Sequence, residues 1–235
     1  FFFMLKTAYE IPLRLVGSEM CIRDSFNTNL YLMEYNNQLI TTGEVNDVGA
    51  YIRENVKKSR RFGVEFTNVL NSKDFYINSS LSLSRNLVYN FNETLYDYGA
   101  DFSQYNIIEN KYVITDLAFS PGVLLNNHFE WKANKFLSFI LNSKYVGKQY
   151  LDNTSNEKRV LKDFLINDFK IQTNLTNNVF NNLFFKIEIN NIFNVKYSSN
   201  GYTFGYYGGM DYEVRENYFY PQATRNIMFS VSIEI

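Results

Sequence analysis

The chain has few of the residues that form disulfides and metal sites: its 235 residues include one cysteine, one histidine and three prolines. A single cysteine closes no disulfide within the chain, and with one histidine it falls short of the ligand set of a structural zinc site. Lys and Arg number 23 and Asp and Glu 24, a formal net charge of −1, without a long block of like charge. This balance excludes the basic surface of a nucleic-acid-binding protein.

Long apolar runs are missing as well. No run of about 18 apolar residues occurs, so a transmembrane helix is excluded by length. Strands of a membrane β-barrel stay compatible with the mean hydropathy of −0.28, because alternating side chains average to mild hydrophilicity. No nucleophile elbow, phosphate loop, metalloprotease helix or pair of catalytic carboxylates is recognisable, so we expect neither an enzyme nor a resident cofactor or metal.

Aromatic residues are abundant, with 19 tyrosines and 22 phenylalanines. They arrive together with Val, Ile and Thr in short runs, and Asn, Asp, Ser and Gly separate these runs. Strand-favouring residues separated by turn-favouring residues predict an all-β protein.

The opening stretch, FFFMLKTAYEIPLRLVGSEMCIRDS, shares no composition or period with the rest of the chain. Residues 15–25 match the translation of the constant end of a transposase sequencing adapter, and residues 6–11 resemble a translated flow-cell primer. We therefore predict that residues 1–25 are a non-native segment, of which 6–25 derive from an adapter, and that residues 26–235 are natural. Cys21 then has no biological role.

Apolar and polar side chains alternate along the natural part. In RNIMFSVSIEI, the residues Ile227, Phe229, Val231 and Ile233 share one face, whereas mostly polar residues occupy the other. Similar alternation occurs in FYINSSLSLSRN, HFEWK and LFFKIEIN. We expect about eight strands, many of them about ten residues long, which suits a tilted membrane crossing.

The expected connections differ in length. Short ones at 71–74, 132–135 and 175–181 alternate with long ones at roughly 41–57, 89–121, 149–161 and 197–222. Short turns on one rim and long loops on the other predict an antiparallel transmembrane β-barrel. A soluble β-sandwich with one wet face is the alternative, although the polar face is rich in Ser and Asn rather than Lys and Glu.

Two stretches, NNIFNVKYSSNGY and YPQATRNIMFSVSIEI, resemble the C-terminal end of TonB-dependent outer-membrane receptors. Upstream segments such as SKYVGKQYLDNTSNE are similar to barrel segments of Bacteroidota-type members. The chain departs from the family pattern at Ile235, where an aromatic residue is usual, and at Thr224, which replaces a common glycine. The resemblance implies that the chain is a C-terminal fragment of a plugged barrel of about 22 strands.

The resemblance also implies a function and partners. A receptor of this kind lies in the cell outer membrane, contacts its lipid, and imports a large scarce nutrient such as an iron–siderophore. Its N-terminal plug, which lies outside this sequence, would contact the inner-membrane TonB complex. The alternative is a self-contained eight-stranded outer-membrane barrel with a structural or small-ligand-binding role.

Tyrosines in two expected external loops are the candidate substrate-binding residues, because they combine flat apolar area with a hydroxyl group. The candidates are Tyr96, Tyr98, Tyr202, Tyr206, Tyr207 and Tyr212. An aromatic girdle at the membrane interface is the competing interpretation, which we favour for Tyr218 and Tyr220.

Two further positions have weaker chemical interpretations. His128 lies within an expected strand on its polar side, so we interpret it as a hydrogen-bonding residue of the lumen rather than a haem ligand. Asp97 and Asp101 could hold Ca²⁺ loosely, but their spacing defines no cage.

Overall fold

The computed structural model describes residues 24–175, 182–209 and 213–234, and their regular structure is all β-strand. The expected adapter segment lies outside the described residues except for Asp24 and Ser25. No helix in the described ranges could cross a membrane. The strands are β1 (Ser25–Val45), β2 (Tyr51–Asn71), β3 (Phe75–Asp97), β4 (Asn106–Asp116), β5 (Val123–Lys132), β6 (Leu137–Val146), β7 (Gln149–Tyr150), β8 (Val160–Leu161), β9 (Phe164–Leu175), β10 (Asn182–Asn190), β11 (Ser198–Tyr207), β12 (Glu213–Pro221) and β13 (Asn226–Glu234).

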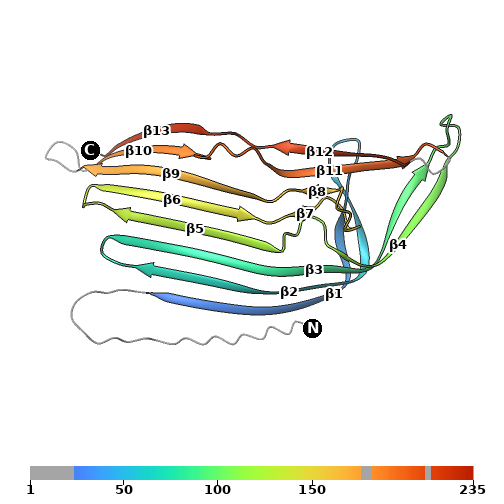
Figure 1. Ribbon diagram of the computed structural model, residues 1–235, viewed down its shortest axis with the longest axis horizontal. Helices are drawn as coiled ribbons and strands as arrows, with labels where there is room; N and C mark the ends of the chain where they lie inside the picture. The colour runs from blue at the N-terminus through green and yellow to red at the C-terminus, as the bar shows by residue number, and fades with distance from the viewer. Residues whose placement is uncertain (1–23, 176–181, 210–212, 235) are drawn as a thin grey trace.

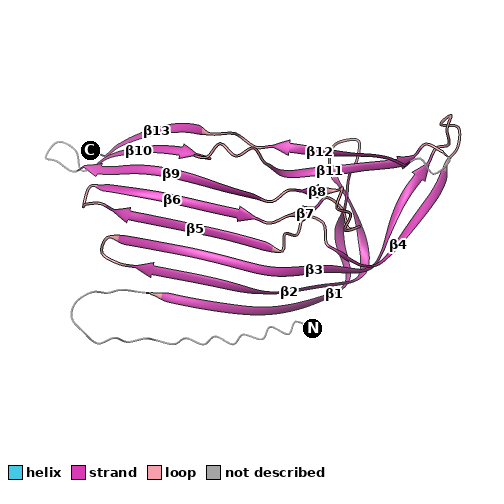
Figure 2. Cartoon of the chain, viewed as in Figure 1, coloured by secondary structure: helices cyan, strands magenta, loops and turns pink. Residues whose placement is uncertain are grey.

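Eight of these strands form one continuous wall in the order β1-β2-β3-β5-β6-β9-β10-β13, and every neighbouring pair is antiparallel (Figure 1). The prediction of an all-β antiparallel fold with about eight wall strands is therefore confirmed. Strand β4 extends the sheet beside β3, β11 pairs with β12, and β7 and β8 form a separate small hairpin. Figure 2 shows that strands account for nearly the whole drawn length of the wall.

The two rims of the wall differ. At the short-turn rim, β2 is connected to β3 by residues 72–74 alone. Strand β5 is connected to β6 by residues 133–136 alone. At the opposite rim, which we call the hairpin rim, residues 98–122, 147–163 and 191–225 carry β4, β7 with β8, and β11 with β12. The predicted asymmetry is present in these connections.

The sequence pattern suggested that the long connections are loops. In the structure they consist largely of paired strands. Strands β1, β2 and β3 run for 21, 21 and 23 residues, whereas β5 and β6 have 10 each, so the first three continue beyond the wall as hairpin strands. The expected loop at 41–57 shrinks to a turn at 46–50. Backbone groups in these projections pair with one another, which satisfies donors and acceptors that a loop would leave to water.

The two faces of the wall are in register across the strands. One row crosses the sheet through Leu70, Ile77, Phe129, Leu141, Phe169, Ile189 and Ile227. The adjacent row on the other face holds Asn78, His128, Asn142 and Asp168. Because side chains alternate strictly along each strand, this register gives one apolar face and one polar face.

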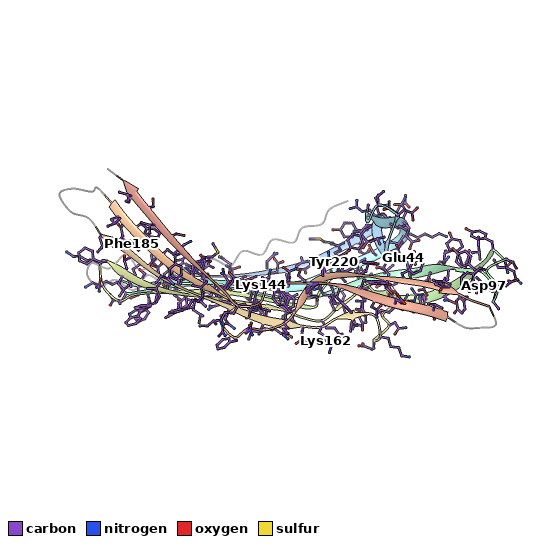
Figure 3. All side chains as sticks on the ribbon, turned by 90° about the horizontal axis from the view of Figure 1, so that it is seen from above. Glu44, Asp97, Lys144, Lys162, Phe185 and Tyr220 are labelled. Carbon is purple, nitrogen blue, oxygen red and sulfur yellow. The ribbon has the colours of Figure 1, made fainter. Side chains whose placement is uncertain are left out.

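The wall is a single layer, as the edge-on view in Figure 3 shows. On the apolar face Ile227, Phe229, Val231 and Ile233 are 55%, 74%, 60% and 54% exposed, so no second sheet among the described residues covers them. This finding excludes the β-sandwich. On the polar face, by contrast, Ile140 is only 7% exposed.

The wall remains open within the described residues. Strands β1 and β13 are its two edges and lie on opposite sides of the sheet in Figure 1. A self-contained eight-stranded barrel requires these strands to pair with each other, because only closure removes sheet edges.

The largest buried cluster lies at the hairpin rim rather than in the wall. Ile40 and Val56 from the β1/β2 hairpin pack with Val88 and Phe91 of β3, together with Leu117. The same hairpin is fastened to β11 because the Tyr51 hydroxyl donates to Gly201 O at 2.8 Å. This small core holds the projecting hairpins together and positions the site described next.

Candidate ligand-binding site

A buried ionic network joins three of the projecting hairpins. Arg159, beside β8, places Nη1 2.7 Å from Glu93 Oε1 on β3 and 2.8 Å from Asp152 Oδ2. Arg215 on β12 places Nη2 2.9 Å from the same Glu93 oxygen. Glu213 Oε1 accepts from both arginines, at 3.1 Å from Arg159 and 2.8 Å from Arg215. Since buried charges are costly unless paired, the network fixes these hairpins relative to one another.

Glu93 is the centre of this network. Its second carboxylate oxygen accepts hydrogen bonds from the Tyr112 hydroxyl at 3.0 Å and from Asn110 Nδ2 at 3.3 Å. Burial alone would raise the pKa of Glu93, but the charges of Arg159 and Arg215 outweigh it, so the pKa lies below its ordinary value. Burial and the neighbouring Glu93 charge raise the pKa of Tyr112 to about 12. Glu93 is therefore held as an anion and Tyr112 as a donor.

An open pocket of about 210 Å³ lies beside the network. Glu44 and Glu54 reach it from the β1/β2 hairpin, and Arg215 and Asp152 border it from the network. Glu54 Oε1 is buried and has no hydrogen-bond partner within the described structure. Burial raises the pKa of Glu54, and it also raises the pKa of Glu44, where the Arg215 charge opposes the shift. Among the described residues, neither Glu44 nor Glu54 has a close ion pair, so the pocket has two carboxyl groups that are not neutralised in this way.

An aromatic cluster lies beside the same pocket. Tyr96, which lines the pocket, stacks on Tyr105 with ring centroids 5.2 Å apart. Tyr98 lies 5.8 Å from Tyr206 and 6.4 Å from Phe102 by the same measure. Phe102 and Tyr105 are largely exposed, so the cluster presents aromatic surface to solvent. Such a surface can stack against a flat or amphipathic ligand.

The structure brings together three of the tyrosines that were predicted from the sequence as candidate substrate-binding residues. Tyr96, Tyr98 and Tyr206 converge in the aromatic cluster from two separate projections. Tyr202 lies elsewhere, stacked on Tyr218 at 4.8 Å. Tyr207 pairs through its backbone with Asp97, and Tyr98 N donates to Tyr207 O at 3.0 Å, so this residue joins the projections through its main chain. Tyr212 lies outside the described residues.

The other sequence candidates have structural partners. His128 Nδ1 lies 2.7 Å from Asn142 Oδ1, which agrees with a hydrogen-bonding residue on the polar face. Asp97 Oδ1 accepts from the backbone N–H groups of Gly99 and Gly209, each at 3.0 Å, and so ties two projections together. In the described ranges, no three His, Cys, Asp or Glu side chains are grouped so as to hold a metal ion.

The ionic network was missed by sequence reasoning. Glu93 and Arg159 are 66 residues apart, and neither belongs to a recognisable motif. A weak signal existed in the placement of charged residues inside segments of strand-like composition, for example Arg215 in EVREN. That signal indicates that a partner is needed and does not identify the partner.

Comparisons with known proteins support the fold. No protein-family model matches the chain, and no curated protein matches it. Solved structures do match. The siderophore receptor PiuA from Acinetobacter baumannii aligns with 88% of this chain at a TM-score of 0.61 and 15% identity. The ferric-catecholate import receptor Fiu from E. coli K12 aligns with 89% at a TM-score of 0.58 and 16% identity.

A third match is the ferripyoverdine receptor of the outer membrane of Pseudomonas aeruginosa, solved bound to ferripyoverdine. It aligns with 89% of this chain at a TM-score of 0.52 and 14% identity. The chain spans about a quarter of the length of these proteins, namely 26%, 25% and 24%. At such low identity the likeness shows the fold alone: the described wall is similar to part of the β-barrel of these proteins.

Proposed function

We propose that residues 26–235 are the C-terminal part of a TonB-dependent outer-membrane receptor that imports a large scarce nutrient, such as an iron–siderophore. The observation that carries this proposal is the eight-stranded wall with one apolar face in register and one polar face. Wall strands of about ten residues match the length of a tilted membrane crossing. The structural likeness to siderophore receptors extends over nearly the whole chain.

The orientation of the wall follows from its rims. Outer-membrane barrels have short periplasmic turns and longer extracellular connections. The short-turn rim would therefore face the periplasm, and the hairpin rim would face outward. The pocket and the aromatic cluster, built from the projections of the hairpin rim, would then be one wall of an external ligand site.

The self-contained barrel is less well supported. It needs β1 and β13 to pair, whereas these strands are the open edges of the sheet. A larger barrel supplies neighbours to both edges, as the resemblance to barrels of about 22 strands implies.

The full-length gene tests the proposal. Amplification from genomic DNA should replace residues 1–25 with coding sequence for further strands and a plug. The full-length protein, expressed in a host that lacks its own siderophore receptors, should restore uptake of ⁵⁵Fe from at least one ferric siderophore. Uptake should disappear in a matched host without TonB.

Two results would contradict the proposal. A gene that places a signal peptide directly before residue 26 would favour the self-contained barrel. If the protein reaches the outer membrane and uptake is equal with and without TonB, the TonB-energised mechanism is wrong.

A further inference from the structure

The open pocket of the candidate ligand-binding site is lined unequally by charges of the two signs. Among the described residues that line it, Arg215 is the single cation. Four lining residues are carboxylic acids, namely Glu44, Glu54, Glu93 and Asp152. The charges that are already paired within the chain decide what remains for a ligand.

The arginine charge at the pocket is used by the ionic network. Arg215 donates from Nε to Glu213 at 2.8 Å and from Nη2 to Glu93 at 2.9 Å. Arg159 donates to Glu93, Asp152 and Glu213. Two guanidinium groups thus face three carboxylates, which leaves one negative charge in excess. Within the described residues the network therefore has no cation left for an anionic ligand.

Glu44 and Glu54 add two carboxyl groups outside the network. Neither forms a close ion pair in the described ranges, and Oε1 of Glu54 is buried without a hydrogen-bond partner there. Because a buried carboxylate oxygen without a donor is costly, a donor supplied by a ligand would stabilise it. Asn153 Nδ2 donates to Thr41 O at 2.7 Å, which holds the hairpin of both glutamates against the β7/β8 projection.

The rest of the lining is apolar or accepts hydrogen bonds. Ile52, Phe91 and Tyr96 give the pocket an apolar and aromatic side. The hydroxyl groups of Thr42 and Thr203 each already donate to a backbone carbonyl oxygen at 3.3 Å, so they offer lone pairs rather than protons. Acceptors beside an aromatic side fit a solute that carries a cationic donor next to a flat group.

We propose that this pocket binds a protonated amine of the imported solute and so selects cationic over anionic ligands. The ammonium group would donate charge-assisted hydrogen bonds to Glu44 and Glu54, and the flat part of the solute would lie against Tyr96. A metal ion fits less well, because no three His, Cys, Asp or Glu side chains of the described chain are grouped to hold one. The inference rests on the proposed function, because it concerns the solute that the receptor imports.

Equilibrium binding of three small phenols to the full-length protein tests the charge preference. Tyramine carries an ammonium group, tyrosol carries a hydroxyl group in its place, and 4-hydroxyphenylacetate carries a carboxylate. At neutral pH the wild-type protein should bind tyramine about tenfold more tightly than tyrosol. It should bind 4-hydroxyphenylacetate more weakly than tyrosol, because the free charge of the pocket is negative.

Variants of the two glutamates assign the preference to the pocket. Glu54→Gln should remove most of it, because the substitution keeps the shape of the side chain and removes its charge, and Glu54→Asp should retain part of it. The double variant with Glu44→Gln should abolish it. Glu157→Gln is the matched control, since it removes the same charge from an exposed side chain outside the pocket. Tyrosol needs no carboxylate, so its equal binding to every variant reports that the pocket is folded.

Equal affinity for tyramine and tyrosol would overturn the inference, and so would a preference that survives in the double variant. Displacement of tyramine by Ca²⁺ at a lower concentration than tyramine would also overturn it, because the carboxylates would then belong to a metal site.

Siderophore uptake distinguishes this inference from the proposed function. Normal TonB-dependent uptake by a protein without any tyramine preference would reject the amine site and leave the receptor function standing. A tyramine preference in a protein that takes up no siderophore would support the amine site and contradict the receptor function.

Discussion

Arg159 and Glu93 form a salt bridge of 2.7 Å in which the side chains are only 6% and 9% exposed, although they are 66 residues apart. Neither residue belongs to the apolar core, and both are held by further partners, Asp152 for the arginine and Arg215 for the glutamate. The pair therefore acts as a cross-link between strand β3 and the β7/β8 projection. Removing Glu93 should leave two arginines, Arg159 and Arg215, that share only the remaining carboxylates Asp152 and Glu213.

Glu93→Gln is expected to destabilise the projecting hairpins by about 1 to 3 kcal/mol, because Arg159 and Arg215 keep their other carboxylate partners. The free energy of local opening, measured by hydrogen exchange of the β7/β8 and β11/β12 amides, reports this loss. Glu157→Gln is the matched control, because it breaks an exposed pair with Lys148 and should cost less than about 1 kcal/mol. Equal effects of the two substitutions would mean that burial does not strengthen the network.

The stability of the projecting hairpins should depend on pH in two separate windows. The pKa of Glu93 is lowered in the folded protein, so its contribution is complete above the ordinary value of 4.5 and is lost as pH falls below that value. The pKa of Glu44 is raised, chiefly by burial, so stability should fall as pH rises above 4.5 towards its folded pKa.

Denaturant midpoints of the tyrosine near-UV circular dichroism, recorded across this pH range, check both signs. Glu93→Gln should flatten the acid side of the profile, and Glu44→Gln combined with Glu54→Gln should flatten the side above 4.5, because burial raises the pKa of both residues. A profile that neither substitution changes would show that other groups carry the pH dependence.

Tyr98 and Tyr206 should be energetically coupled, because their rings meet edge to face at 5.8 Å. A double-mutant cycle with Tyr98→Ala and Tyr206→Ala is expected to give about 0.5 to 1.5 kcal/mol of coupling in the opening free energy of β11 and β12. The cycle of Tyr98→Ala with Tyr202→Ala is the control. Tyr202 stacks on Tyr218 instead, so its coupling to Tyr98 should be close to zero. Similar coupling in both cycles would contradict the aromatic cluster.

The wall was predictable from the sequence because one physical constraint acts along each strand. FYINSSLSLSRN must place alternate side chains in different surroundings, so its period of two is visible without knowledge of its neighbours. The neighbours then repeat the constraint, and Ile77 meets Phe129 in the observed register. The resemblance at the C-terminal end added the expectation of a larger barrel.

The projections and their site were less predictable because no such constraint acts there. Residues 106–116 form β4, and exposure alternates along much of it, but apolar and polar residue types occur on both faces, which leaves little periodicity to detect in the sequence. The aromatic candidates could be chosen by residue type, yet the stacking of Tyr202 on Tyr218 depends on how β11 pairs with β12. Glu93 and Arg159 become partners only when distant hairpins pack together, so this pairing cannot be predicted from the local sequence.

The two faces of β13 should respond oppositely to charge if the wall spans a membrane. Val231 lies on the apolar face opposite Phe185, and Ser232 lies on the polar face opposite Phe184. A lysine at position 231 would have to enter the lipid, whereas a lysine at position 232 would face the hydrated interior. Val231→Lys is therefore expected to cost about 2 to 4 kcal/mol near the middle of the bilayer, and Ser232→Lys should cost almost nothing. Urea midpoints of the full-length protein folded into phosphatidylcholine vesicles measure both costs.

The prediction is specific to lipid, because in water the side chain of Val231 is already 60% exposed and the same lysine would cost little. Equal midpoints for the two variants would therefore mean that the apolar face does not contact a bilayer.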